Sequence, residues 1–198
     1  MSQMNLNRRG ALQLFITGSL PLVAAPVRAK AAPDAAALLR SGGCVLMLRH
    51  AQTDPGIGDP PGFSLAQCST QRNLSQEGRE QARRIGRWFA AQNLSAVAVQ
   101  SSQWCRCKDT SALAFGQFAV LPALNSTFGE PSAAAAQTRA LAARLRTIAA
   151  GRFEVWVTHQ VNITALTGEF AGMGEAFVVR AAGEAGQVLA STRFEVTP

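Results

Sequence analysis

The stretch from residue 45 to residue 51 constrains the fold of this chain more than any other. A short apolar run, Val45-Leu46-Met47-Leu48, ends abruptly in Arg49 and His50. Gly42-Gly43 lie before the run and Asp54-Pro55-Gly56 lie after it. A brief apolar segment between such turn residues is typical of a buried strand rather than a helix.

A second apolar run, residues 153–158, ends in His159, and the chain has only these two histidines. Ligands of open parallel sheets bind beyond the carboxyl ends of the strands, so we expect both histidines at one crevice. A single histidine after a strand is more often a structural residue, and Arg49 alone could be a solvated charge. Together with His50, however, these residues would place a nucleophile, a donor and a cation in one site.

The remaining pattern alternates helices and strands and ends in a hairpin. It predicts a three-layer α/β/α sandwich with a mostly parallel central sheet and an antiparallel edge. The expected helices begin at the caps Asp34, Ser75 and Ser132, the last one closed by Gly151, and a further helix carries Arg106. Further strands are expected at 96–99 and 118–121, and the hairpin at 176–179 and 188–190.

Residues 1–29 have the pattern of an export signal, which leaves 30–198 as a single domain. Arg8-Arg9 precede an apolar stretch, 11–25, that is too short and too polar to span a bilayer stably. A small-x-small site at Ala29 suits cleavage, after which we expect no stable membrane insertion. Both a twin-arginine and an ordinary Sec signal fit, and either predicts a periplasmic or secreted protein.

The charge and the cysteines exclude two classes of protein. Cleavage after Ala29 removes three arginines and no acid, so the net charge falls from +7 to +4. Arginines around an anionic substrate explain this charge, and no arginine-rich run with interleaved aromatics predicts nucleic-acid binding. The four cysteines form no Cys-x-x-Cys pair, and with two histidines they do not predict a zinc site.

Three segments resemble the histidine phosphatase superfamily, which has the phosphoglycerate-mutase-like fold. Residues 48–51 with Thr53 resemble its first motif, 157–160 its second histidine motif, and 101–106 the segment that carries its second arginine. The resemblance covers residues 44 to about 165.

The resemblance implies a metal-free and cofactor-free reaction on a small phosphorylated substrate. It makes His50 the nucleophile, and Arg49, Arg106 and His159 the groups that hold the phosphoryl group. Further substrate contacts are expected from Thr53, Arg72 and Gln160.

The general acid is the residue at which the family pattern is least well matched. Relatives usually place a carboxylate in the segment that corresponds to residues 124–130, but Ser126 stands where that acid often falls. Glu130 is the nearest carboxylate and is the predicted acid. The alternatives are that Glu130 only favours the start of the following helix, or that Asp54 is the acid.

Residues 51–74 form a long segment rich in glycine and proline. We interpret it as a substrate-covering loop, and the alternative is a mobile surface insertion. Cys68 lies in this segment, whereas Cys105 and Cys107 flank Arg106, so all three should border the same pocket. We therefore predict a disulfide between Cys68 and one of the other two, against the alternative of four reduced thiols.

The sequence thus predicts an exported phosphomonoester hydrolase that works through a phosphohistidine. A phosphorylated sugar of the cell envelope is one substrate that exported relatives suggest. The alternatives are a non-catalytic phosphate-binding module of the same fold and a phosphoprotein phosphatase. A mutase is disfavoured because its glycolytic substrates are cytosolic, and nothing in the sequence indicates an oligomeric state.

Overall fold

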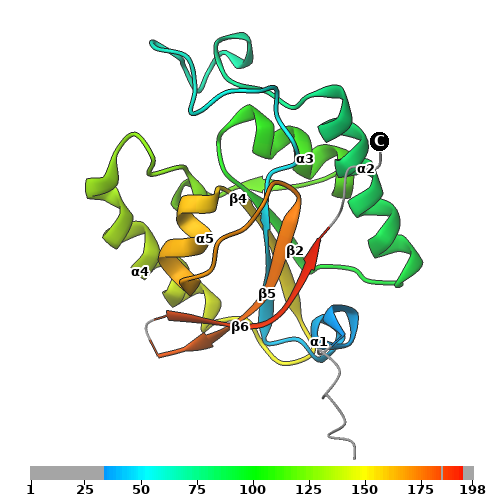
Figure 1. Cartoon of the computed structure of the whole chain (residues 1–198). Coiled ribbons are helices and arrows are strands. Elements are labelled where there is room, and N and C mark those ends of the chain that lie inside the picture. Colours follow the sequence, from blue (N-terminus) through cyan, green and yellow to red (C-terminus); the bar gives the residue numbers. More distant parts are fainter. Residues whose placement is uncertain (1–33, 184, 194–198) are drawn as a thin grey trace, which may run out of the picture. The chain divides into compact units, whose positions relative to one another are not determined.

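A six-stranded sheet forms the centre of the computed structural model, which describes residues 34–183 and 185–193 (Figure 1). The strand order is β3-β2-β4-β1-β5-β6. The neighbouring pairs among the first four strands are parallel, whereas β5 pairs antiparallel with both β1 and β6. The strands are β1 (Cys44–Arg49), β2 (Ala98–Ser101), β3 (Ala119–Val120), β4 (Phe153–Thr158), β5 (Glu175–Ala182) and β6 (Ala185–Arg193).

Helices cover both faces of this sheet. Figure 1 shows α2 and α3 on one side of the strands and α4 and α5 on the other. The α-helices are α1 (Ala35–Ser41), α2 (Gln76–Ala91), α3 (Cys105–Phe115), α4 (Ala134–Leu145) and α5 (Gln160–Thr167). Short 3-10 turns occupy Cys68–Thr70, Pro122–Leu124 and Pro131–Ala133. The predicted three-layer sandwich and the closing hairpin are confirmed.

The central strand β1 is buried on both faces, which explains its unbroken apolar sequence. Its side chains alternate between two hydrophobic clusters. One cluster joins alternate β1 residues to α2 and includes Cys44, Leu46, Leu48, Ile85 and Phe89. The other joins the remaining β1 residues to α4 and α5 and includes Val45, Met47, Leu141, Leu145 and Ile163.

The register of β1 against β4 brings the two histidines together. Arg49 pairs with Thr158, so the residue after each strand is a histidine at the same edge of the sheet. The backbone N–H of His50 continues the ladder by donating to the carbonyl of Thr158 at 3.0 Å. The predicted convergence of His50 and His159 follows directly from this pairing.

Helix starts agree with the sequence at two of the three predicted caps. The side chain of Asp34 accepts from the N–H of Ala36, and that of Ser75 accepts from the N–H of Gly78. Ser132 does not cap α4. Ser132 lies inside the 3-10 turn that begins at Pro131, a position that suits proline because its φ angle is fixed and it has no N–H to donate. Helix α4 starts after this turn, two residues beyond Ser132.

Other boundaries differ from the prediction too, among them the end of α4 and the start of β2. Helix α4 ends at Leu145, so Gly151 does not close it; Gly151 instead adopts a φ of 72° in the turn before β4 and donates to the carbonyl of Ser41. Strand β2 begins at Ala98 rather than Ala96, since its ladder with β4 pairs Ala98 with Glu154.

One glycine fixes the segment that follows β1 against α2. A Cβ atom on Gly78 would lie 1.8 Å from the carbonyl oxygen of Gln52, so only glycine permits this approach. The N–H of Ser75 donates to the same carbonyl at 3.1 Å. The start of α2 therefore packs directly on the backbone beside His50.

The long loop between β1 and α2 is tied down by a disulfide. Cys68 is bonded to Cys105, the first residue of α3, while Cys44 and Cys107 are buried free thiols. The predicted bridge is confirmed, with Cys105 as the partner. The export signal predicted at residues 1–29 lies outside the described residues. No helix in residues 34–183 and 185–193 has the length and apolarity needed to cross a membrane.

We predict that Cys68→Ser lowers the free energy of unfolding by about 4 kcal/mol, as expected for a bridge between residues 37 apart. Cys68 is exposed, so its sulfur contributes little by packing and the loss reports the bridge itself. Urea unfolding of Cys68→Ser, Cys105→Ser and the double variant measures it. A double variant that loses no more than Cys105→Ser alone supports the bridge, because Cys105 is buried and its replacement has a cost of its own, and losses that add would contradict it. Thiol counting after denaturation without reductant should find two free thiols.

Candidate active site

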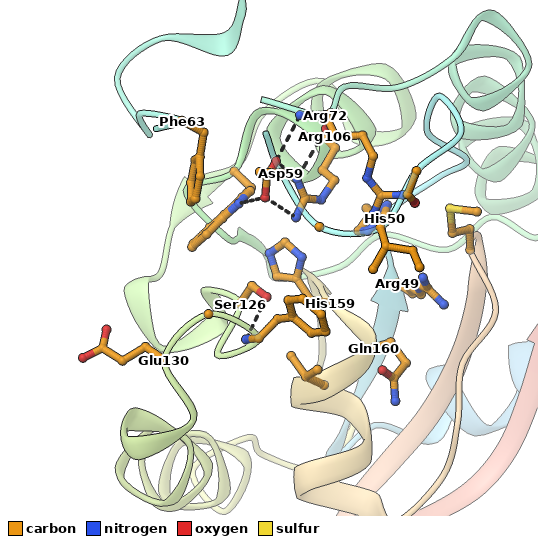
Figure 2. A pocket seen from close by; sticks show the side chains of 18 residues that line it. Arg49, His50, Asp59, Phe63, Arg72, Arg106, Ser126, Glu130, His159 and Gln160 are labelled. Carbon is orange, nitrogen blue, oxygen red and sulfur yellow. Dashed lines mark hydrogen bonds and ion pairs between the residues drawn. The ribbon is translucent and has the colours of Figure 1, made fainter. Parts of the chain in front are cut away.

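A cavity of about 720 Å³ opens at the carboxyl edge of β1 and β4 (Figure 2). The loop between β1 and α2 forms one wall, and the segment before α4 forms another. Polar lining residues are Arg49, His50, Asp59, Arg72, Arg106, Ser126, Glu130, His159 and Gln160. Apolar lining residues are Ile57, Phe63, Trp104, Phe128, Val161 and Met173, with glycines at 56, 58 and 129.

His50 is buried and is held in one tautomer. Its Nδ1 lies 2.8 Å from the carbonyl oxygen of Ala51, which can only accept, so Nδ1 carries the proton and Nε2 the lone pair. Burial, followed by the positive charge of Arg106, holds the pKa of His50 well below its usual value. The ring is therefore neutral near pH 7 and can act as a nucleophile.

His159 lines the same cavity, and its ring is oriented by the hydroxyl of Ser102. Its ring centroid lies 5.6 Å from that of His50, and its Nε2 lies 2.9 Å from the hydroxyl of Ser102. That hydroxyl also lies 3.3 Å from the side-chain oxygen of Asn125, and it can give its single proton to only one of these two partners. Burial lowers the pKa of His159 as well, and the electrostatic coupling to the His50 ring and the charge of Arg106 lower it further. The Cys107 thiol lies 3.5 Å from Nε2, and burial raises its pKa to about 12, so it stays protonated.

Arg106 is buried against a carboxylate that the sequence did not single out. Asp59, in the long loop, accepts from Nη1 of Arg106 at 2.7 Å and from Nη2 at 3.2 Å. It also accepts from the indole N–H of Trp104 at 2.9 Å and from the backbone N–H of Arg72 at 3.0 Å. Burial raises the pKa of Asp59, but the hydrogen bonds and charge of Arg106 outweigh it, so the pKa is lowered. Asp59 therefore positions Arg106 and is a poor proton donor.

Three guanidinium groups converge on the cavity. Arg49 donates to the carbonyl of Ala171 at 2.7 Å, and Arg72 donates to that of Gly56 at 2.6 Å. The Nε atoms of Arg49, Arg72 and Arg106 are buried and have no acceptor among the residues that the structure describes. Burial and the other two arginines lower the pKa of Arg49, so these like charges oppose one another. Buried donors and unbalanced positive charge together indicate a site for an anion.

Of the other predicted site residues, some line the cavity and some do not. Thr53 does not line the cavity, because its hydroxyl is buried and turned to the sulfur of Met173 at 3.6 Å. Gln160 lines it, with its amide nitrogen donating to Thr164 at 2.7 Å. Glu130 lies at the rim, and Figure 2 shows its carboxylate directed away from both histidines. Asp54, the alternative acid, is exposed and is not a lining residue.

Sequence reasoning missed Asp59 and the apolar part of the lining. Asp59 stands among glycines and prolines, where nothing marks it as the partner of an arginine 47 residues away. Ser102 lies in a segment that we identified through Arg106 alone. No group of three or more His, Cys, Asp or Glu residues in the described part of the chain is placed to hold a metal ion.

Comparison with known proteins agrees with this geometry. Residues 45–130 match the family model of the histidine phosphatase superfamily, branch 1. No curated protein matches the chain.

Among solved structures, the protein histidine phosphatase SixA complexed with tungstate is 16% identical, with a TM-score of 0.51 over 76% of this chain and 96% of that one. A putative alpha-ribazole-5'-P phosphatase from Escherichia coli K-12 is 15% identical, with a TM-score of 0.55 over 78% and 99% of the two chains. The alpha-ribazole phosphatase from Shigella flexneri is 17% identical, with a TM-score of 0.52 over 78% and 100%. At these identities the likeness concerns the fold.

The matched segment contains the first motif and Arg106, and the sheet register adds His159 to them. Residues 45–130 are therefore similar to the histidine phosphatase superfamily, branch 1, and the fold is similar to that of solved phosphatases.

Proposed function

We propose that this protein hydrolyses phosphomonoesters without a metal, through a phosphohistidine at His50. The observation that carries the proposal is the neutral His50, with its lone pair on Nε2, in a cavity that three arginines also line. A phosphate monoester has the negative charge that the guanidinium groups attract, and phosphorus is an electrophile for the imidazole.

The reaction would proceed in two displacements. In the first, Nε2 of His50 forms a bond to phosphorus while the ester P–O bond breaks and the leaving oxygen takes a proton. In the second, water attacks the phosphohistidine, which releases phosphate and restores the imidazole. Arg49, Arg106 and His159 would stabilise the charge on the transferring oxygens, and one such donor is typically worth about 3–4 kcal/mol.

We predict that His50→Ala abolishes both turnover and covalent labelling. Rapid quenching during turnover of a ³²P-labelled monoester should trap an acid-labile, base-stable phosphoenzyme in the natural protein. His159→Ala is the matched control: it should slow labelling roughly 100- to 1000-fold, the effect of losing one donor, without moving the label. Label that persists in His50→Ala, or that maps to His159, would contradict the assignment.

We propose Glu130 as the acid that protonates the leaving group. It lies at the rim and directs its carboxylate outward, so the segment between Ser126 and Glu130 would have to turn inward around a bound substrate. Asp59 is already committed to Arg106 and Trp104. Glu130 is thus the carboxylate of the lining that remains available.

We predict that Glu130→Gln slows hydrolysis of alkyl phosphates by about 100-fold or more, the usual contribution of a general acid. Hydrolysis of p-nitrophenyl phosphate should change little, because its leaving group needs no protonation. Asp54→Asn serves as the matched control and should leave both rates unchanged. Equal slowing of the two substrates by Glu130→Gln, or none, would assign the proton to Asp54 or to water.

The outward direction of the Glu130 carboxylate also favours a second candidate function, that of a non-catalytic module that binds phosphate groups. Such a protein would bind inorganic phosphate through Arg49, Arg72 and Arg106 but would release none from an alkyl ester. A phosphoprotein substrate remains a further alternative, and a panel of phosphomonoesters that includes sugar phosphates and phosphopeptides separates these possibilities. For an exported protein, a phosphorylated sugar of the cell envelope belongs in that panel.

We also propose that the protein is exported, from the paired arginines, the apolar stretch and the cleavage site within residues 1–29. A disulfide between Cys68 and Cys105 supports an oxidising compartment.

We predict that fractionation of the native host recovers a chain that begins near Lys30 or Ala32, outside the cytosol. Mass spectrometry of the isolated protein identifies the first residue, and Arg8→Lys/Arg9→Lys distinguishes twin-arginine from Sec export. Uncleaved protein in the cytosol would contradict export and would reopen the possibility of a mutase.

A further inference from the structure

We propose that the leaving group of the substrate is apolar, an alkyl or aromatic alcohol, held between the loop after β1 and Phe128. This inference rests on the proposed phosphatase function and concerns the part of the cavity that phosphate does not reach. The cationic groups and the histidines gather at the buried end, at the edge of β1 and β4. A volume of about 720 Å³ leaves most of the cavity to the leaving group.

The outer part of the cavity is lined by large apolar side chains that the fold does not cover. Ile57 is 92% exposed, Phe128 63% and Phe63 38%, although all three line one cavity. The ring of Phe63 also lies 5.9 Å from that of Trp104, centroid to centroid. Exposed apolar side chains that gather at the mouth of a site mark a binding surface, because nothing in the folded chain is stabilised by leaving them in water.

These side chains come from two walls that approach each other. A Cβ atom on Gly58 would lie 3.6 Å from the ring of Phe128, so the loop and the segment before α4 approach each other at this point. Trp104 lines the cavity, and its indole N–H is taken by Asp59, so it offers no free donor to a ligand. An apolar group joined to phosphate at the buried end would pass between these two walls.

Several polar side chains of the same lining already have partners within the protein, and Glu130 is the carboxylate that remains for a ligand. Asp59 is engaged by Arg106, Trp104 and the backbone of Arg72. The hydroxyl of Ser126 accepts from the N–H of Phe128, and the amide nitrogen of Gln160 donates to Thr164. A sugar with several hydroxyls needs several such groups free and would leave the apolar walls in contact with its polar edges. The lining therefore favours a hydrocarbon or an aromatic ring over the phosphorylated sugar that export alone suggests.

A series of n-alkyl phosphates tests this inference on the full chain with its disulfide intact. Ethyl, butyl, hexyl and octyl phosphate leave alcohols of nearly equal acidity, so chain length changes binding rather than chemistry. We expect kcat/KM to rise roughly two- to fourfold per methylene up to the chain length that fills the cavity, as burial of each methylene predicts. Glucose 6-phosphate should be at least about tenfold poorer than hexyl phosphate, measured by phosphate release below the aggregation range of the esters.

Two variants locate the effect and a third controls for it. Ile57→Ser and Phe128→Ser should each lower the octyl-to-ethyl ratio of kcat/KM at least about threefold, because each removes apolar contact with the chain. Val97→Ser is the matched control, since Val97 is 47% exposed but lies outside the cavity. It should keep both rates, and thermal unfolding should show that all three variants remain folded.

Two results would overturn the inference and leave the phosphatase function intact. One is a kcat/KM that is independent of chain length, and the other is a higher kcat/KM for glucose 6-phosphate than for hexyl phosphate. A third result bears on the position of the leaving group. If Ile57→Ser, Phe128→Ser and Val97→Ser all preserve the chain-length dependence, the apolar contact lies elsewhere and the proposed position between the loop after β1 and Phe128 is rejected. Failure to hydrolyse any monoester, p-nitrophenyl phosphate included, would reject the proposed function and this inference with it.

Discussion

The site depends first on the parallel pairing of β1 with β4. Arg49 and Thr158 are partners in this ladder, so the next residue on each strand is a histidine beyond the hydrogen-bonded edge. A shift of one residue in either strand would move every side chain of that strand to the opposite face of the sheet and into the wrong cluster. The alternation of β1 between two buried clusters thus fixes the register, and the register fixes the distance between His50 and His159.

The second constraint is the buried ion pair between Asp59 and Arg106. Burying two charges costs several kcal/mol for each ion, and the cost is recovered only with good geometry and additional hydrogen bonds. Arg106 donates to Asp59 through both Nη atoms, and Trp104 and the backbone of Arg72 supply further donors to the carboxylate. The pair holds Arg106 in place and attaches a loop of glycines and prolines to α3, close to the bond between Cys68 and Cys105.

Local patterns in the sequence were sufficient for the sheet and for the residues at strand ends. Apolar runs bounded by glycine mark β1 and β4, and the side-chain caps at Asp34 and Ser75 are read from neighbouring residues. The predicted cap at Ser132 was wrong because Pro131, one position earlier, starts a 3-10 turn instead. Asp59 could not be found in this way, since its partner is 47 residues distant and the pairing depends on how the loop folds back.

The charges of the buried end also bear on what the outer end accepts. Three arginines and one carboxylate leave two positive charges there, because burial and the arginines keep both histidines neutral. A phosphate monoester dianion balances those two charges, so no further anion is needed for recognition. The rest of the ligand is then selected by the outer walls, where Ser126 and Gln160 already have hydrogen-bond partners and Ile57, Phe63 and Phe128 are not covered. Electrostatics thus fixes where the phosphoryl group lies, and apolar contact decides which alcohol can be attached to it.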